Sequence, residues 1–193
     1  MTSPALPPYI ALCGKPTAGK TTVAEVLDLL YGYKLADDGQ FLRQIAMNQF
    51  GLSYHQVHTQ AGKLEKVVIN GEEMTVRDVL GRIGNGFEQQ FGANVIPELA
   101  HKTLKPGQRY VFGSVRREQA AYHKSRGALV IEVQNQFATP SPYEFDQYNP
   151  AHIDLAIVND FNPAGGNPMD AKYLLQRHID MAISRYLRPL PVA

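Results

Sequence analysis

Gly14-Lys15-Pro16-Thr17-Ala18-Gly19-Lys20-Thr21 fits the Walker A pattern of a glycine, four residues and then Gly-Lys-Thr. The apolar run Tyr9 to Cys13 leads into it as a strand would, and apolar residues at helical spacing follow it from about Lys20 to Tyr31. A strand, a glycine-rich turn and a helix in this order direct backbone N–H groups and the positive end of the helix toward one point. The sequence therefore predicts a loop that binds a polyphosphate.

Each residue type in this loop has a separate expected role. The glycines allow a tight turn, Lys20 reaches the β- and γ-phosphates, and the Thr21 hydroxyl takes one position on Mg²⁺. Thr22 is expected to pack or cap rather than to bind the metal. The residues expected to bind the nucleotide are Gly14, Lys15, Ala18, Gly19, Lys20, Thr21 and Thr22.

The composition narrows the class of partner. The chain has 193 residues, enough for one domain that buries about 70% of its unfolded surface. Its 19 basic and 18 acidic residues nearly cancel, which favours small-molecule nucleotides as partners over nucleic acid or a membrane surface. The single cysteine, Cys13, lies on the apolar strand and is expected to be a small core residue. We expect a cytoplasmic protein, and a homodimer remains open.

Five expected strands alternate with helices along the chain, which predicts an α/β fold with a mainly parallel five-stranded sheet and helices on both faces. The strands are expected at 9–13, 33–36, 110–113, 128–133 and 153–158. We interpret residues 1–193 as a single domain with a core of about 9–39 and 109–187. The segment of about 40–108 is expected to be an insertion that binds an acceptor substrate, and the segment of about 136–152 is expected to be a flap.

Charged residues follow two of these strands at the edge of the sheet where ligands bind. Asp37 and Asp38 follow the second strand. Asp37 has Gln40 three residues later and so suits either a helix cap or catalysis. Arg43 on the next helix suits either a solvated surface charge or a donor to an acceptor phosphate. Arg116 stands just after the third strand.

Several local patterns are clear enough to predict turns and helix ends. Asn70-Gly71 between short apolar runs predicts a hairpin with a type I′ turn. Gly32 is expected to end the first helix, and Asn167 to cap the last helix, which starts at Pro168. A helix of about 75–91 contains three glycines, which indicate close packing or approach of the backbone to a ligand.

The chain resembles the phage-type deoxynucleoside monophosphate kinases, within the P-loop nucleoside monophosphate kinase group. The resemblance rests on the Walker A loop, the Ala36-Asp37 turn, the segment Thr75 to Gly84, and Val111 to Val133. It implies a P-loop NTP hydrolase-like three-layer fold and transfer of a phosphate from ATP, with Mg²⁺, to a deoxynucleoside 5′-monophosphate. For a phage-encoded protein the location would be the host cytoplasm. The implied catalytic residues are Lys20, Arg116, Asp37 and Asp38, the implied metal ligands are Thr21 and Asp38, and the implied substrate-binding residues are Asp37, Arg43, Arg77 and Arg116.

Two departures from the family pattern bear on activity. Ser114 stands where the family has an aspartate, so that Asp37 or Asp38 would have to supply the carboxylate for Mg²⁺. The segment 136–152 contains no Lys or Arg, although many such kinases close arginines over the transferred phosphate. Two alternatives therefore stay open: another small-molecule P-loop kinase, such as one acting on dephospho-coenzyme A, or a nucleotide-binding regulator with degraded catalysis.

Overall fold

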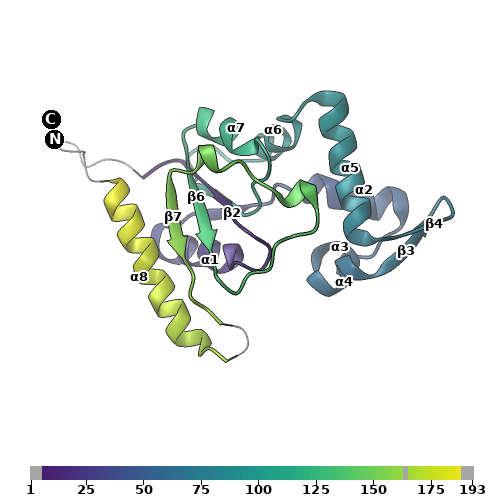
Figure 1. Ribbon diagram of the computed structural model, residues 1–193. Helices are drawn as coiled ribbons and strands as arrows, with labels where there is room; N and C mark the ends of the chain where they lie inside the picture. Colours follow the sequence, from purple (N-terminus) through teal and green to yellow (C-terminus); the bar gives the residue numbers. More distant parts are fainter. Residues whose placement is uncertain (1–5, 163–164, 188–193) are drawn as a thin grey trace. The chain divides into compact units, whose positions relative to one another are not determined.

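The computed structural model describes residues 6–162 and 165–187, which divide into two compact units. The first unit runs up to Ala36 and again from Leu104, and the second unit is Asp37–Thr103. The first unit contains β1 (Tyr9–Cys13), α1 (Lys20–Tyr31), β2 (Lys34–Ala36), β5 (Tyr110–Phe112), α7 (Gln119–Ser125), β6 (Ala128–Gln134), the short 3₁₀ helices η1 (Glu144–Asp146) and η2 (Pro150–His152), β7 (Leu155–Val158) and α8 (Pro168–Tyr186). The second unit contains α2 (Gln40–Phe50), α3 (Tyr54–His58), α4 (Gln60–Leu64), β3 (Lys66–Ile69), β4 (Glu72–Thr75), α5 (Val76–Phe91) and α6 (Val95–Lys102) (Figure 1).

The strands of the first unit form one parallel sheet in the order β2-β5-β1-β6-β7. β1 is the central strand, with Ile10 beside Val111 of β5 and beside Leu129 of β6. The chain builds one side of β1 first and then crosses to the other side for β6 and β7. In such sheets ligands bind outside the carboxyl end of the strand at which the order reverses. That strand is β1, and Gly14 follows it directly.

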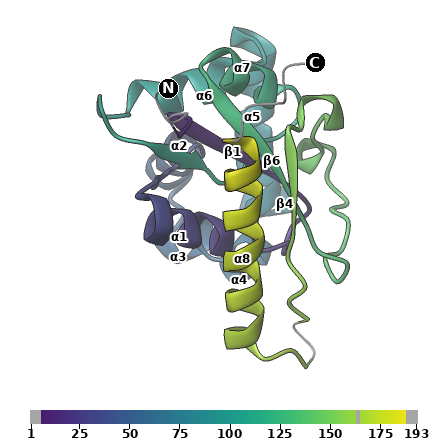
Figure 2. The same cartoon turned by 90° about the vertical axis from the view of Figure 1, so that its left-hand side faces the viewer.

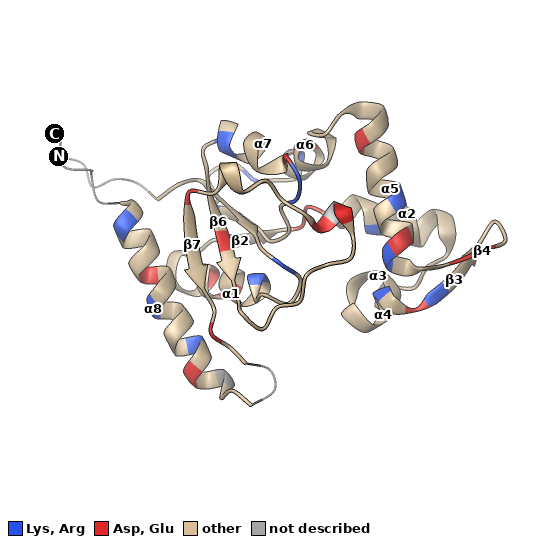
Figure 3. Cartoon of the chain, viewed as in Figure 1, with Lys and Arg blue, Asp and Glu red and all other residues tan. Residues whose placement is uncertain are grey.

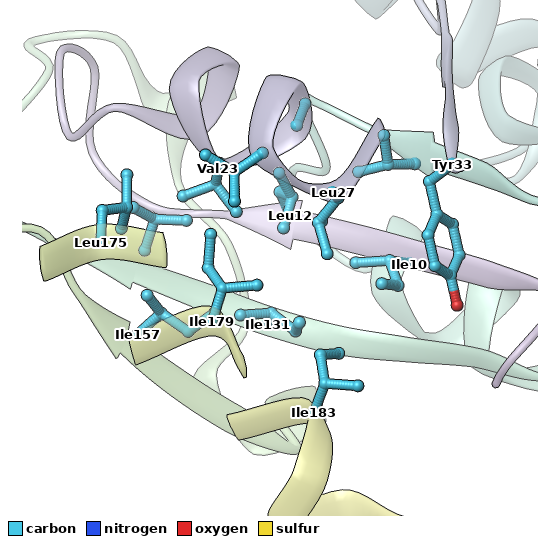
Figure 4. Close-up of a cluster of buried hydrophobic side chains, with 14 of the residues drawn as sticks. Ile10, Leu12, Val23, Leu27, Tyr33, Ile131, Ile157, Leu175, Ile179 and Ile183 are labelled. Atoms are coloured by element: carbon cyan, nitrogen blue, oxygen red, sulfur yellow. The ribbon is translucent and has the colours of Figure 1, made fainter. Parts of the chain in front are cut away.

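Helices cover both faces of this sheet, as predicted. α1 and α8 pack on one face, and Figure 2 shows α8 running in front of the sheet. On the other face lies α7, where the His123 ring centroid is 4.2 Å from that of Phe112. Burial on both faces explains why β1 and most of β6 are continuous apolar runs. The side chains that fill the space between the sheet and the two helices include Ile10, Leu12, Val23, Leu27, Ile131, Ile157, Leu175, Ile179 and Ile183 (Figure 4).

The predicted helix ends agree with the structure where a single residue determines them. Gly32 ends α1 with a φ of 68°, a left-handed angle that glycine adopts without strain. Asn167 begins α8, and its side chain accepts a hydrogen bond from the Met169 N–H at 3.0 Å. α6 covers Val95–Lys102, and the Thr103 N–H that follows it bonds the Ala100 carbonyl at 3.1 Å.

The second unit contains helices and one small hairpin, β3-β4. Asn70 and Gly71 at its turn have φ angles of 52° and 79°, which confirms the predicted type I′ turn. Two glycines of α5, Gly84 and Gly86, are not explained by tight contacts. A Cβ on Gly84 would lie 3.5 Å from Leu42, an ordinary contact, and one on Gly86 would meet nothing within 4 Å.

The start of α2 corrects one of the two roles considered for Asp37. The N-cap residue is Gly39, and no side chain caps this helix. The Asp37 carboxylate instead accepts the N–H of Gly39 at 3.2 Å and forms an ion pair with Arg43. The ion pair with Arg43, the fourth residue of α2, therefore keeps the Asp37 carboxylate from forming the expected capping box with Gln40.

Charges of both signs occur along α8 and on the hairpin (Figure 3). Lys66 and Glu73 pair across the hairpin at 2.6 Å. Within the described ranges, no helix combines the length and the apolar character needed to cross a bilayer.

Candidate phosphate-binding site

The loop between β1 and α1 needs glycine at two positions of the Walker A pattern. Gly14 has a φ of 140°, and a Cβ on it would lie 2.4 Å from the carbonyl oxygen of Val133 in β6. Gly19 has a φ of 95°, and a Cβ there would lie 2.2 Å from the side-chain nitrogen of Asn159. Both distances are shorter than real Cβ contacts. A larger residue at either position would therefore push the loop away from β6 or from the end of β7.

The ammonium group of Lys20 bridges the loop from its helical end to its beginning. Its Nζ donates to the carbonyl oxygens of Gly14 at 2.7 Å and Lys15 at 2.9 Å. The Ala18 N–H donates to the same Lys15 carbonyl at 3.2 Å, and the Val23 N–H donates to the Gly19 carbonyl at 3.0 Å. The carbonyls of Gly14, Lys15 and Gly19 thus already accept hydrogen bonds from protein groups. The Lys20 ammonium lies against the backbone of the loop.

The first turn of α1 adds further positive character. Gly19 provides no side-chain cap, so the first N–H groups of the helix need partners from outside it. The Thr21 side chain is exposed beside them, which leaves its hydroxyl accessible to a metal ion. The described residues contain no cluster of three or more His, Cys, Asp or Glu that could hold a metal. Mg²⁺ bound with a nucleotide fits these residues, because it takes most of its ligands from phosphate and water.

Asn159, directly after β7, fastens the loop to the sheet. Asn159 is 5% exposed, and its Nδ2 donates to the Ala18 carbonyl at 2.8 Å. Its own N–H donates to the Gln134 carbonyl at 2.8 Å, and its Oδ1 accepts the Phe161 N–H at 3.3 Å. This residue was not predicted from the sequence, where its only signal is a lone asparagine after an apolar strand.

Cys13 is a core residue, as expected. It is 1% exposed, and its Sγ lies 3.6 Å from the carbonyl oxygen of Ile131. Burial, and secondarily the charge of Glu132, raise the pKa of the Cys13 thiol to about 12. The thiol is therefore neutral at ordinary pH and does not act as a nucleophile.

Arg116 follows β5 and contacts the segment 136–152 that we predicted to be a flap. Its Nη2 lies 3.3 Å from Oδ1 of Asp146, whose side chain is 8% exposed. The neighbouring Arg117 N–H donates to the Gln147 carbonyl at 2.6 Å, which ties the segment to the end of β5. A phosphate that approached Arg116 would compete with Asp146 for its guanidinium group. Movement of this segment stays a prediction.

Two predicted residues of the second unit form a close pair. Asp37 and Arg43 are joined by an ion pair, and the Arg43 side chain is 17% exposed. A Cβ on Gly39 would lie only 2.8 Å from Arg43 Nη1, so this glycine leaves room for the guanidinium. The Arg43 guanidinium is thus largely shielded from solvent, and its role as a donor to an acceptor phosphate stays a prediction.

The remaining predicted residues are distributed between the units. Asp38 is partly buried at the start of the second unit, and Arg77 on α5 donates to Gln60 Oε1 of α4 at 2.8 Å. The first unit brings together the loop and its support at the carboxyl edge of the sheet, and it also carries Arg116. The second unit carries Asp37, Asp38, Arg43 and Arg77.

No protein-family model and no curated protein sequence matches the chain. Among solved structures, dephospho-CoA kinase from Campylobacter jejuni is similar, with 14% sequence identity and a TM-score of 0.49 over 93% of this chain and 100% of that chain. A likeness this distant assigns neither an activity nor a substrate to the present protein.

Proposed function

We propose that this protein is a P-loop kinase that transfers the γ-phosphate of Mg²⁺-bound ATP to a deoxynucleoside 5′-monophosphate. One observation carries the proposal: a Walker A loop follows the central strand of a parallel sheet, at the point where the strand order reverses. Lys20, the loop N–H groups and the first turn of α1 all favour a polyphosphate there.

Phosphoryl transfer suits a site of this kind, because the reaction needs positioning and positive charge more than a covalent intermediate. Lys20 supplies a cation at the loop, and Arg116 is a second cation of the same unit. Arg43 and Arg77 supply planar guanidinium donors for an acceptor monophosphate in the second unit. Thr21 would supply a hydroxyl ligand for Mg²⁺, which when bound neutralises charge on the phosphates.

The ion pair between Asp37 and Arg43 favours a second class of acceptor. A carboxylate beside Arg43 partly cancels the positive charge that a monophosphate dianion requires. The same carboxylate would suit an acceptor hydroxyl, whose proton it can accept. An alcohol such as dephospho-coenzyme A is therefore the alternative acceptor.

Steady-state ADP formation tests both proposals when deoxynucleoside monophosphates, ribonucleoside monophosphates and dephospho-coenzyme A are each supplied as acceptor. Lys20→Ala should lower acceptor-dependent turnover by at least about a hundredfold, because it removes a preorganised cation. Lys34→Ala is the matched control, since Lys34 is exposed on β2 and pairs with Asp28 at 2.7 Å.

The outcomes separate the candidate functions. Turnover that depends on a monophosphate supports the main proposal. Turnover that occurs only with dephospho-coenzyme A supports the alternative acceptor instead. ATP binding without any acceptor-dependent turnover would indicate a nucleotide-binding regulator. Near-normal turnover of the Lys20→Ala variant would refute the role of the loop.

A further inference from the structure

Glu132 is a carboxylate that lies level with the end of β1. The register of β1 and β6 pairs it with Cys13, the residue directly before Gly14. Residues paired in register on parallel strands point to the same face of the sheet. Besides burial, the negative charge of Glu132 raises the pKa of the Cys13 thiol and the positive charge of Lys20 lowers it. By its register Glu132 lies beside Cys13, one residue before the loop begins.

Two neutral groups hold the carboxylate in place. The Tyr148 hydroxyl donates to Oε1 at 2.5 Å, and the Gln134 side-chain amide donates to Oε2 at 2.6 Å. Burial, together with the hydrogen bond to Glu132, raises the pKa of Tyr148, so this hydroxyl keeps its proton and remains a donor. Neutral donors orient a carboxylate but leave its negative charge in full.

Three neighbouring carboxylates of the first unit differ from Glu132, because each of them pairs with an arginine, a lysine or a histidine. Asp146 pairs with Arg116 at 3.3 Å, and Asp154 pairs with Lys124 at 2.6 Å. Glu118 lies 2.9 Å from the ring nitrogen of His152. Glu132 alone among these four is both oriented by neutral donors and paired in register with the strand that leads into the loop.

On the opposite side of β1, the described residues at the end of β5 include no carboxylate. P-loop proteins hold Mg²⁺ with the loop hydroxyl and with an acidic residue from a neighbouring strand. The end of β5 offers Ser114, and the next N–H, that of Val115, donates to the Leu12 carbonyl at 3.1 Å. Ser114 thus stands beside the end of β1 with a hydroxyl where a carboxylate would serve the metal.

We propose that Glu132, positioned by Tyr148, supplies the acidic group that retains Mg²⁺ on the bound nucleotide, together with Thr21. The inference rests on the proposed nucleotide binding and replaces Asp38 as the acidic partner of the metal. Mg²⁺ keeps several of its waters in proteins, so the carboxylate acts by accepting hydrogen bonds from that water shell. Its loss should weaken metal retention about 10- to 100-fold, the usual effect of removing such an outer partner.

Calorimetric titration with ATP in EDTA and at graded Mg²⁺ concentrations separates metal retention from nucleotide binding. We expect Glu132→Gln to bind ATP in EDTA at least as tightly as the wild type, because a negative charge near the phosphates has been removed. The gain in affinity on adding Mg²⁺ should shrink about 10- to 100-fold. Tyr148→Phe keeps the carboxylate and should show a smaller loss in the same direction.

Glu118→Gln is the matched control, since Glu118 also accepts hydrogen bonds from the segment 136–152, through Asn149 at 3.0 Å. It should leave the Mg²⁺ dependence unchanged. An Mg²⁺ dependence of Glu132→Gln equal to that of the wild type would overturn the proposal, and so would equal losses in EDTA and in Mg²⁺, which indicate a structural role. If the wild type binds no ATP in either condition, the proposed function is refuted, and this inference is refuted with it.

Discussion

Replacing Asn159 by alanine tests whether the end of β7 supports the Walker A loop. The variant removes the donor to the buried Ala18 carbonyl, at 2.8 Å, and the acceptor of the Phe161 N–H, at 3.3 Å. A buried polar group left without its partner costs about 1–3 kcal/mol, and the longer second bond should lie at the low end of that range. We therefore expect the free energy of unfolding to fall by about 2–4 kcal/mol. ATP affinity should also fall, because the Ala18 carbonyl is no longer held away from the incoming phosphates.

Asn135 provides a matched control for this variant. It is 9% exposed, and it bonds to the Phe161 carbonyl at 3.0 Å and to the Phe137 N–H at 2.7 Å. Asn135→Ala should therefore lower the stability by a similar amount and leave ATP affinity nearly unchanged. Asn159→Asp should be worse than Asn159→Ala, because it places an oxygen against the Ala18 carbonyl. Urea unfolding and calorimetric ATP titration measure the two quantities. Equal loss of ATP affinity in the alanine variants of Asn159 and Asn135 would refute a specific role of Asn159 in the loop.

Three further outcomes are expected. Gly14→Ala should destabilise the protein and abolish ATP binding, since its Cβ would lie 2.4 Å from the Val133 carbonyl, and a thermal shift with ATP as large as that of the wild type would contradict this. The folded protein keeps a proton on Cys13 that the unfolded chain releases, because the pKa of the thiol is raised from 9.0 to about 12, so stability should fall as the pH rises above 9. Cys13→Ala should make that fall shallower in urea unfolding at pH 8 and pH 10.5, and an identical pH dependence would exclude a contribution from the thiol. Arg77→Lys and Arg116→Lys should each weaken use of a monophosphate acceptor by about 1–3 kcal/mol while the KM for ATP stays nearly constant, because lysine keeps the charge and loses the planar fork. A raised KM for ATP with an unchanged KM for the acceptor would instead assign these arginines to the donor.

Features controlled by a single residue or by a short run of residues could be predicted from the sequence. The Walker A glycines at 14 and 19 require backbone angles that other residues rarely adopt, so their spacing specifies the loop wherever a strand leads into it. Gly32 ends α1 and Asn70-Gly71 turns the hairpin for the same reason. The alternation of apolar strands with helices was enough to predict a parallel sheet covered on both faces.

Features that depend on partners distant in the sequence could not be predicted. Asn159 contacts Ala18 only because β7 ends beside the loop, and the two residues are 141 positions apart. Asp37 has a helix-capping pattern, yet the ion pair with Arg43 decides where its carboxylate lies. Glu132 is the one charged residue of β6, and only the register places it beside Cys13. For Asn159 and Glu132 the strand order, which local sequence does not encode, brings the partners together, whereas for Asp37 two local interactions compete for one carboxylate.

The resting position of Lys20 bears on which anions the loop can discriminate. Its ammonium bonds the Gly14 and Lys15 carbonyls, and a bound phosphate can attract it only by drawing it away from them. Free inorganic phosphate, with a single phosphorus centre, offers few oxygens to compensate for two broken hydrogen bonds. A triphosphate bound at the loop would be long enough to meet the lysine and the backbone N–H groups at the same time. Because these two hydrogen bonds must be broken, the loop should bind a triphosphate more tightly than orthophosphate. Cellular orthophosphate should therefore compete poorly with a nucleoside triphosphate.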